Sequence, residues 1–123
     1  MSRILVVDDD ADVRELIQLA LAGQGHDVAS VASGRAALEQ LAQHAYDLIV
    51  CDLHMPGMDG VTSYREVERR NPVAARRIVL MTLHSNSEEY RDFLRGVYAP
   101  VLNKPFTLDE FRSTLARMVG PRR

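Results

Sequence analysis

Polar side chains follow four of the short apolar runs in this sequence, at the point where each run ends. In chain order they are Asp8, Asp9 and Asp10, then Asp52, then Thr82, then Asn103 and Lys104. Ligands of parallel α/β sheets bind outside the carboxyl ends of the strands, so these residues would share one edge if the runs form such a sheet. Carboxylates brought together raise one another's pKa and cost stability unless a cation neutralises them. We therefore expect a cation at this edge.

The residue types favour magnesium and phosphoryl chemistry. The ligands offered are oxygen atoms, with no clustered His or Cys, and this set suits Mg²⁺ better than zinc or copper. Magnesium usually takes one or two carboxylates and keeps several waters, which leaves positions for phosphoryl oxygens. Lys104 would add a point charge and Thr82 a hydroxyl donor to the same oxygens, as phosphoryl-transfer sites require.

Acids at strand ends also serve as helix N-caps, and this simpler role has to be weighed for each of them. For Asp10 and Asp12 we favour the cap. For Asp52 the cap is less convincing, because the following Leu53-His54-Met55-Pro56-Gly57 has the composition of a loop with no immediate helix start.

The elements that must position these residues alternate along the chain. Apolar runs predict strands, and the runs are Ile4 to Val7, Asp27 to Val31, Leu48 to Cys51, Ile78 to Met81, and Val101 with Leu102. Three of the five are continuously apolar, as expected of strands covered on both faces. Alternation with segments of helical period predicts five βα units around one parallel sheet.

Helical spacing and caps mark the intervening segments. Apolar stripes are formed by Val13, Leu16, Ile17 and Ala20, by Tyr90, Phe93, Leu94 and Val97, and by Leu108, Phe111, Leu115 and Met118. Ser85 with Glu88 and Thr107 with Glu110 have the spacing of capping boxes. Glycines mark the ends: Gly23 and Gly25 close the first helix, Gly34 opens the second, and Gly60 lies at the turn into the third.

Length and composition predict one folded domain. The chain has 123 residues, and we expect the domain to span 1–119 with a short tail at 120–123.

The net charge of the chain is −2 and comes from acids and bases in mixed order, so we expect no direct binding to nucleic acid or to a membrane. No apolar run reaches the length of a membrane span, the first residues do not form a signal peptide, and Cys51 is the single cysteine. These features favour a cytoplasmic location.

The motifs VVDDD, CDLHMPGMDG, VLMT and NKPF, in this order, resemble the response-regulator receiver domain of bacterial two-component signalling. The resemblance covers essentially the whole chain. It implies an α/β fold, namely a single doubly wound, flavodoxin-like (βα)5 domain similar to chemotaxis regulators. Its five-stranded parallel sheet would have the order 2-1-3-4-5, with the site at the carboxyl edge.

The resemblance also implies roles for individual residues. Asp52 would be the phosphoacceptor, taking a phosphoryl group from a histidine kinase or phosphotransfer protein. Asp9, Asp52 and the backbone carbonyl of His54 would bind Mg²⁺ directly, and Asp8 mainly through a coordinated water. Thr82 would move to hydrogen-bond the phosphoryl group, and Lys104 would pair with it, followed by a proline that is often cis.

The implied output is a change in a surface. Phosphorylation would reshape the face formed by the fourth helix, the fifth strand and the fifth helix for binding a downstream protein or output domain. A phosphorylation-dependent homodimer through this face is a further expectation. The domain would be a switch and no enzyme beyond Mg²⁺-dependent self-phosphorylation and slow autodephosphorylation.

The sequence departs from the family pattern in several places. Val101 stands where an aromatic residue usually reports the position of the threonine, and the spacing from Gly96 to Lys104 is one residue longer than usual, with Tyr98 as a candidate substitute. Leu83 follows the threonine where a small residue is common, so access to the site could be narrower. His54 and His84 lie two positions beyond Asp52 and Thr82, where the family tunes attack by water.

Three other functions share part of this set of residues. A phosphatase of the haloacid-dehalogenase type needs a second acid two residues after the nucleophile, and that place holds His54. A flavodoxin-like cofactor protein would need a phosphate-cradling glycine loop, which is absent from the sequence. The alternative that stays open is a pseudo-receiver, a phosphorylation-independent protein-interaction module, which Val101 would favour and the full set of site residues would oppose.

Overall fold

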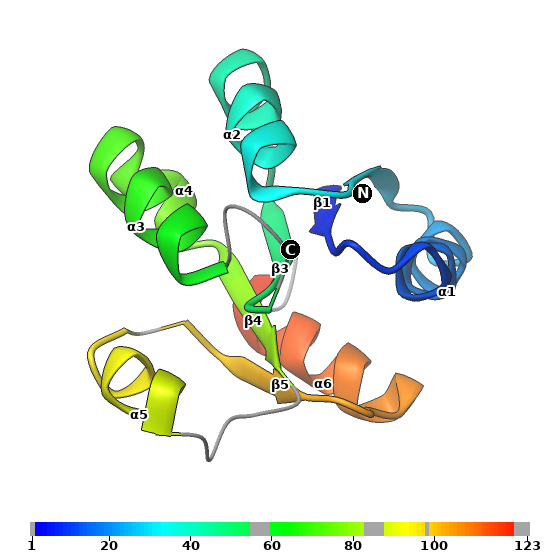
Figure 1. The fold of residues 1–123 in the computed structure, drawn as a ribbon. Helices are drawn as coiled ribbons and strands as arrows, with labels where there is room; N and C mark the ends of the chain where they lie inside the picture. The colour runs from blue at the N-terminus through cyan, green and yellow to red at the C-terminus, as the bar shows by residue number, and fades with distance from the viewer. Residues whose placement is uncertain (1, 55–59, 83–87, 98, 120–123) are drawn as a thin grey trace.

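The computed structural model describes residues 2–54, 60–82, 88–97 and 99–119 (Figure 1). Five parallel strands form one sheet in the order β2-β1-β3-β4-β5, which confirms the predicted topology. The strands are β1 (Arg3–Val7), β2 (Asp27–Val31), β3 (Leu48–Asp52), β4 (Ile78–Thr82) and β5 (Val101–Asn103). The helices are α1 (Ala11–Ala22), α2 (Gly34–Gln43), α3 (Gly60–Arg70), α4 (Pro72–Ala75), α5 (Glu88–Arg95) and α6 (Leu108–Val119).

The predicted strands are all present, and β1, β3 and β4 are buried along nearly their whole length. Four of the five are one residue longer than the apolar runs, because the parallel ladder includes Arg3 and extends to Asp52, Thr82 and Asn103. Asp52, Thr82 and Asn103 are therefore held by strand geometry, which restricts where their side chains can point.

Side chains that alternate along the strands fill two hydrophobic clusters, one on each face of the sheet. On one face α1 and α6 cover the cluster that contains Val6, Val50 and Met81. On the other face α2, α3, α4 and α5 cover the cluster that contains Leu5, Ile49 and Leu80 (Figure 1). The domain is a three-layer sandwich with its central strands shielded from water.

Two of the predicted apolar stripes contain an error. Leu16 is 56% exposed and Leu108 is 43% exposed, although both were expected to face the core. In α1 the buried positions are Ile17 and Leu21, so the inner face is rotated by about one residue from the predicted stripe. Leu108 is the first residue of α6, ahead of the turn that reaches the sheet at Phe111.

The capping predictions are largely confirmed. The Asp10 side chain accepts a hydrogen bond from the Asp12 amide and caps α1, whereas the expectation that Asp12 itself is a cap is wrong, because it lies inside the first turn. Thr107 and Glu110 form the reciprocal capping box of α6, with bonds of 3.1 and 3.0 Å. Ser85 lies outside the described residues.

Helix α4 was not predicted. The Asn71 side chain accepts a hydrogen bond from the Ala74 amide, and Pro72 occupies the first turn. Both are standard features of a helix start, so the Asn-Pro pair was a readable signal for this short turn between α3 and β4.

Candidate functional site

Three carboxylates meet at the carboxyl edge of the two central strands. Asp8 follows β1 and Asp52 ends β3, and these strands are paired with Val7 opposite Cys51. Carboxylate oxygens of Asp8, Asp9 and Asp52 all lie within 4.8 Å of one another. Asp8 is fully buried and Asp52 is 5% exposed, while Asp9 faces solvent. The predicted acidic cluster therefore exists, with one of its members open to water.

Lys104 joins the cluster from the end of β5, the last strand in the sheet order. Its Nζ lies 2.8 Å from Asp8 Oδ2 and 3.4 Å from Asp52 Oδ2, and its side chain is 15% exposed. The Lys104 amide donates to the Thr82 carbonyl at 2.8 Å, which fixes the chain after β5 against the end of β4. The Lys104–Pro105 bond is cis, as the resemblance implied.

Burial and neighbouring charge perturb the pKa values at this edge. Burial, followed by the charge of Asp8, raises the pKa of Asp52, although Lys104 and the His54 amide act in the opposite direction. Burial alone would lower the pKa of Lys104, but its hydrogen bond to Asp8 and the charges of Asp52 and Asp8 raise it above the ordinary value. Lys104 is therefore held as a cation, and the site retains an excess of negative charge that a divalent ion would neutralise.

Thr82 lies at the same edge, at the end of β4. It is fully buried and pairs with Asn103 of β5, and it directly follows Met81, the register partner of Asp52. Asn103, by contrast, is exposed. The hydroxyl predicted to serve the site thus lies one residue beyond the strand position that faces Asp52.

The remaining predicted residues divide into described and undescribed ones. His54 is exposed, and its amide donates to Asp52 Oδ1 at 3.3 Å. Val101 is half-buried and pairs with Leu80 across β4 and β5. Leu83, His84 and Tyr98 lie outside the described residues. The expectations for those three stay predictions.

The structure adds two residues that sequence reasoning missed. Arg14 of α1 donates from Nη1 to the Asp8 carbonyl at 2.8 Å, and so fixes the loop that carries the acids. Tyr90 of α5 has its hydroxyl 3.0 Å from Nδ1 of His54. Arg14 lies in the first turns of the helix that Asp10 caps, so its proximity to the acidic cluster could have been predicted. The sequence placed Tyr90 only in an apolar helical stripe, with no indication of a contact with His54.

Gly60 allows α3 to begin against the chain that follows Asp52. Its amide donates to the Leu53 carbonyl at 2.9 Å. A Cβ atom at this position would lie 2.3 Å from Leu53 Cα and 2.4 Å from the Asp52 carbonyl oxygen, both of them backbone atoms. The glycine predicted at this turn is thus required by close approach of two backbones.

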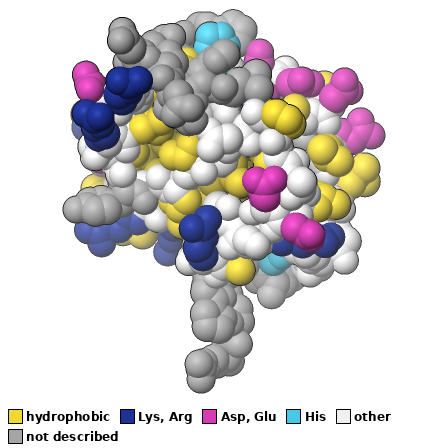
Figure 2. Space-filling model, turned by 90° about the horizontal axis from the view of Figure 1, so that it is seen from below, with side chains coloured by type: hydrophobic (Ala, Val, Ile, Leu, Met, Phe, Trp, Pro, Cys, Tyr) yellow, Lys and Arg dark blue, Asp and Glu magenta, His cyan; other side chains and the backbone are white. Residues whose placement is uncertain are grey.

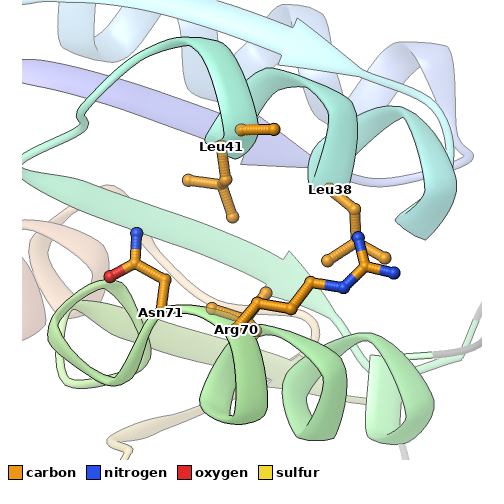
Figure 3. A pocket seen from close by; sticks show the side chains of 6 residues that line it. Leu38, Leu41, Arg70 and Asn71 are labelled. Atoms are coloured by element: carbon orange, nitrogen blue, oxygen red, sulfur yellow. The ribbon is translucent and has the colours of Figure 1, made fainter.

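A hollow away from the acids offers different chemistry. It has a volume of about 250 Å³ and lies between α2 and α3, where Leu38 and Leu41 face Arg70 and Asn71 (Figure 3). Its lining comes from the later turns of these helices, which lead back to the amino edge of the sheet. None of the carboxylates of the cluster lines it, so the chemistry of the cluster and this hollow are separate.

The chain resembles known regulators in sequence. It is 38% identical over 117 residues to the transcriptional regulatory protein ZraR of Escherichia coli, covering 95% of this chain and 26% of that protein. It is 32% identical to the DNA-binding transcriptional regulator NtrC of the same organism, covering 95% and 24%. The chain therefore spans about a quarter of the length of these curated relatives.

Solved structures show the same fold over nearly their full length. The Vibrio cholerae chemotaxis protein CheY4 superposes with a TM-score of 0.85 at 29% identity, covering 96% of this chain and 98% of that one. The Thermotoga maritima response regulator TrrA, solved in complex with Mg²⁺-BeF, gives 0.83 at 31% identity, covering 96% and 99%.

No helix among the described residues is long and apolar enough to cross a membrane. The family model for the response regulator receiver domain matches residues 4–116, which is nearly the whole of the 123-residue chain. Together with the sheet order and the acidic edge, this match shows that the chain belongs to the response regulator receiver domain family of two-component signalling.

Proposed function

We propose that this chain is a phosphorylation switch in which Asp52 accepts the phosphoryl group. The observation that carries the proposal is the position of Lys104 Nζ, which lies between the buried carboxylates of Asp8 and Asp52. A cation held at this point can pair with a phosphoryl oxygen on Asp52 without leaving Asp8. Receiver domains are signalling modules, so we expect no turnover of an external substrate beyond the phosphodonor.

The residues fit a magnesium ion. The donors are oxygen atoms, three of them on carboxylates that lie within 4.8 Å of one another, and the pKa of Asp52 is raised by burial and by Asp8. Asp8, Asp9 and Asp52, together with the His54 carbonyl, would hold the ion. When bound, Mg²⁺ supplies charge neutralisation to the phosphoryl oxygens. Asp9, the exposed member, leaves a path for the ion and the phosphodonor.

The transfer step is a simple substitution at phosphorus. A carboxylate oxygen of Asp52 forms a bond to phosphorus while the bond from phosphorus to the donor breaks, at nitrogen for a phosphohistidine or at oxygen for acetyl phosphate. The product is an acyl phosphate, which water cleaves to regenerate the carboxylate and release phosphate. Lys104 stabilises the transferred charge, and the Thr82 hydroxyl donates to it after the switch.

The donor would be a histidine kinase or phosphotransfer protein, and the output would pass through α5, β5 and α6. Figure 2 views the molecule from this side and shows hydrophobic side chains across the middle of the face. Lys and Arg lie mainly at the left and below, and Asp and Glu lie mainly at the right. A hollow of about 370 Å³ between β5 and α6 is lined by both signs of charge, among them Asp109, Glu110 and Arg117. Such a mixed face suits a protein partner, a linked output domain or a second copy of the chain.

The alternative is a pseudo-receiver that binds partners without phosphorylation. One observation favours it: Val101, half-buried in β5, cannot act as the usual aromatic switch residue. The intact contacts of Lys104 with Asp8 and Asp52 count against it, since a site with no phosphoryl group to bind has no need of buried like charges.

Intact mass after incubation with acetyl phosphate and Mg²⁺ tests the proposal. We expect a single phosphoryl adduct on the wild-type protein that is lost on chelation and in Asp52→Asn. Asp12→Asn, an exposed acid in the first turn of α1, is the matched control and should be modified like wild type. Absence of an adduct in folded wild-type protein would replace the proposal by the pseudo-receiver. An equal adduct in Asp52→Asn would overturn the assignment of Asp52 as the acceptor.

A further inference from the structure

The imidazole of His54 ties the proposed phosphorylation site to helix α5. Its Nδ1 lies 3.0 Å from the hydroxyl of Tyr90, a residue 36 positions away along the chain. The backbone amide of His54 donates to Asp52 Oδ1 at 3.3 Å. One residue is therefore bonded to the acceptor carboxylate through its main chain and to α5 through its side chain.

Tyr90 is placed to pass on any displacement of His54. It is 2% exposed and belongs to the hydrophobic cluster under α5, together with Leu80 and Phe93. In the next turn, Phe93 stands edge-on to Tyr64 of α3 at 5.5 Å between ring centroids. A tyrosine ring packed at core density cannot move its hydroxyl freely, because its neighbours fill the space around it. A shift of His54 must move α5 or break the hydrogen bond.

The usual route from the site to the output face is altered in this chain. Val101 stands where the family commonly has an aromatic residue, it pairs in register with Leu80, and its side chain has no polar atom. Strand β5 therefore offers no aromatic ring at this position to follow Thr82. Tyr90 supplies both an aromatic ring and a hydroxyl on the adjoining helix, with the hydroxyl at the site and the ring in the core.

We infer that the His54–Tyr90 hydrogen bond couples the state of Asp52 to the position of α5, with Tyr90 acting as the positioning residue for His54. The inference rests on the proposed function, because it requires a phosphoryl group on Asp52. Phosphorylation changes the acceptor of the His54 amide, and the main-chain shift moves the imidazole that Tyr90 holds. Coupling of this kind is reciprocal, so a protein bound to α5 changes how strongly the site holds a phosphoryl mimic.

Tyr90→Phe removes the hydroxyl and keeps the ring, which makes it the sharpest test. Tyr46→Phe is the matched control, because Tyr46 is 5% exposed in the same cluster and its hydroxyl donates at 2.8 Å to Oε1 of Gln40, a residue of α2. Two nuclear magnetic resonance readouts apply. One is the ¹⁵N signal of the His54 ring in the unmodified protein, and the other is the shift of the amide signals of Arg91–Arg95 on adding beryllofluoride with Mg²⁺.

We expect Tyr90→Phe to change the His54 ring signal and to reduce the response of these α5 amides by about twofold or more, because the hydrogen bond that couples the two sites is gone. Tyr46→Phe should leave both unchanged. Phosphoryl adducts measured by mass should still form on both variants. An unchanged ring signal, an equal α5 response in Tyr90→Phe and wild type, or an equal loss in Tyr46→Phe would overturn the inference while the proposed function stands. A wild-type protein that forms no adduct would overturn both.

Discussion

Replacing Lys104 by Met tests how the acidic edge is stabilised. Methionine keeps the unbranched shape and most of the length of the side chain, and removes the charge that lies 2.8 Å from Asp8 and 3.4 Å from Asp52. Asp8 is fully buried and Asp52 is 5% exposed, so their repulsion is poorly screened by water. We expect Lys104→Met to lower the free energy of unfolding by about 3 kcal/mol, the low end for a buried pair, because Lys104 keeps 15% of its exposure.

The loss should depend on pH with a definite sign. The pKa of Asp52 is raised in the folded protein by burial and by Asp8, and Lys104 lowers it, so the variant raises it further. A carboxyl group whose pKa is higher in the folded than in the unfolded state stabilises the fold fully at a pH below its unfolded pKa. This contribution is lost as the pH rises through the raised, folded-state pKa. The deficit of Lys104→Met relative to wild type should therefore shrink as the pH falls through the further-raised pKa of Asp52 in the variant.

Urea unfolding at about pH 7.5 and about pH 5.5, with and without Mg²⁺, measures both effects. Arg69→Met is the control, because Arg69 pairs with Glu66 on the surface with 67% of its side chain exposed, and its loss should cost much less than the loss of Lys104. Mg²⁺ should restore part of the stability of Lys104→Met. A loss no larger than that of Arg69→Met, or a deficit that grows on acidification, would refute this electrostatic reasoning.

Three further predictions concern the surroundings of the site. Gly60→Ala should lower the free energy of unfolding, measured with urea, by about 3 kcal/mol, because its Cβ would lie 2.3 Å from Leu53 Cα. In the control Gly96→Ala the nearest atom to the new Cβ lies at 3.7 Å, so the cost should be under about 0.5 kcal/mol, and equal effects would contradict the close approach at Gly60. Cys51 is buried, and burial together with the neighbouring acids raises its pKa to about 12. It should therefore resist alkylation by iodoacetamide in the native state, and rapid labelling of folded protein would contradict its buried position. Thr107→Ala removes the acceptor of a 3.0 Å cap bond and should lower the free energy of unfolding by about 1 kcal/mol, with no change expected if that cap is absent.

The fold could be predicted because the apolar runs in the sequence coincide with the buried strands of the structure. Strands covered on both faces must be continuously apolar, and the runs ending at Val7, Cys51 and Met81 satisfied this condition. The order of the strands came from the resemblance, since periodicity alone does not say which strands are neighbours. The errors at Leu16 and Leu108 arose because a hydrophobic residue on a helix does not by itself identify the inner face; apolar side chains on protein surfaces are common.

The residues of the site that lie at strand ends could be predicted from the sequence. Asp8 and Asp52 could be placed together because parallel strands end at one edge, and Lys104 joined them through the sheet order. Hydrogen bonds between distant elements were not readable. Nothing in local spacing relates His54 to Tyr90, because their contact depends on how α5 packs on the sheet.

The residue that carries the phosphoryl group can be identified directly. An aspartyl phosphate formed with acetyl phosphate and Mg²⁺ can be reduced by borohydride to homoserine, and peptide mass spectrometry then identifies the residue. We predict conversion of Asp52 alone, with Asp8 and Asp9 unchanged. Conversion of Asp8 or Asp9 in place of Asp52, or no conversion in folded protein, would contradict the role assigned to the buried carboxylate at the end of β3.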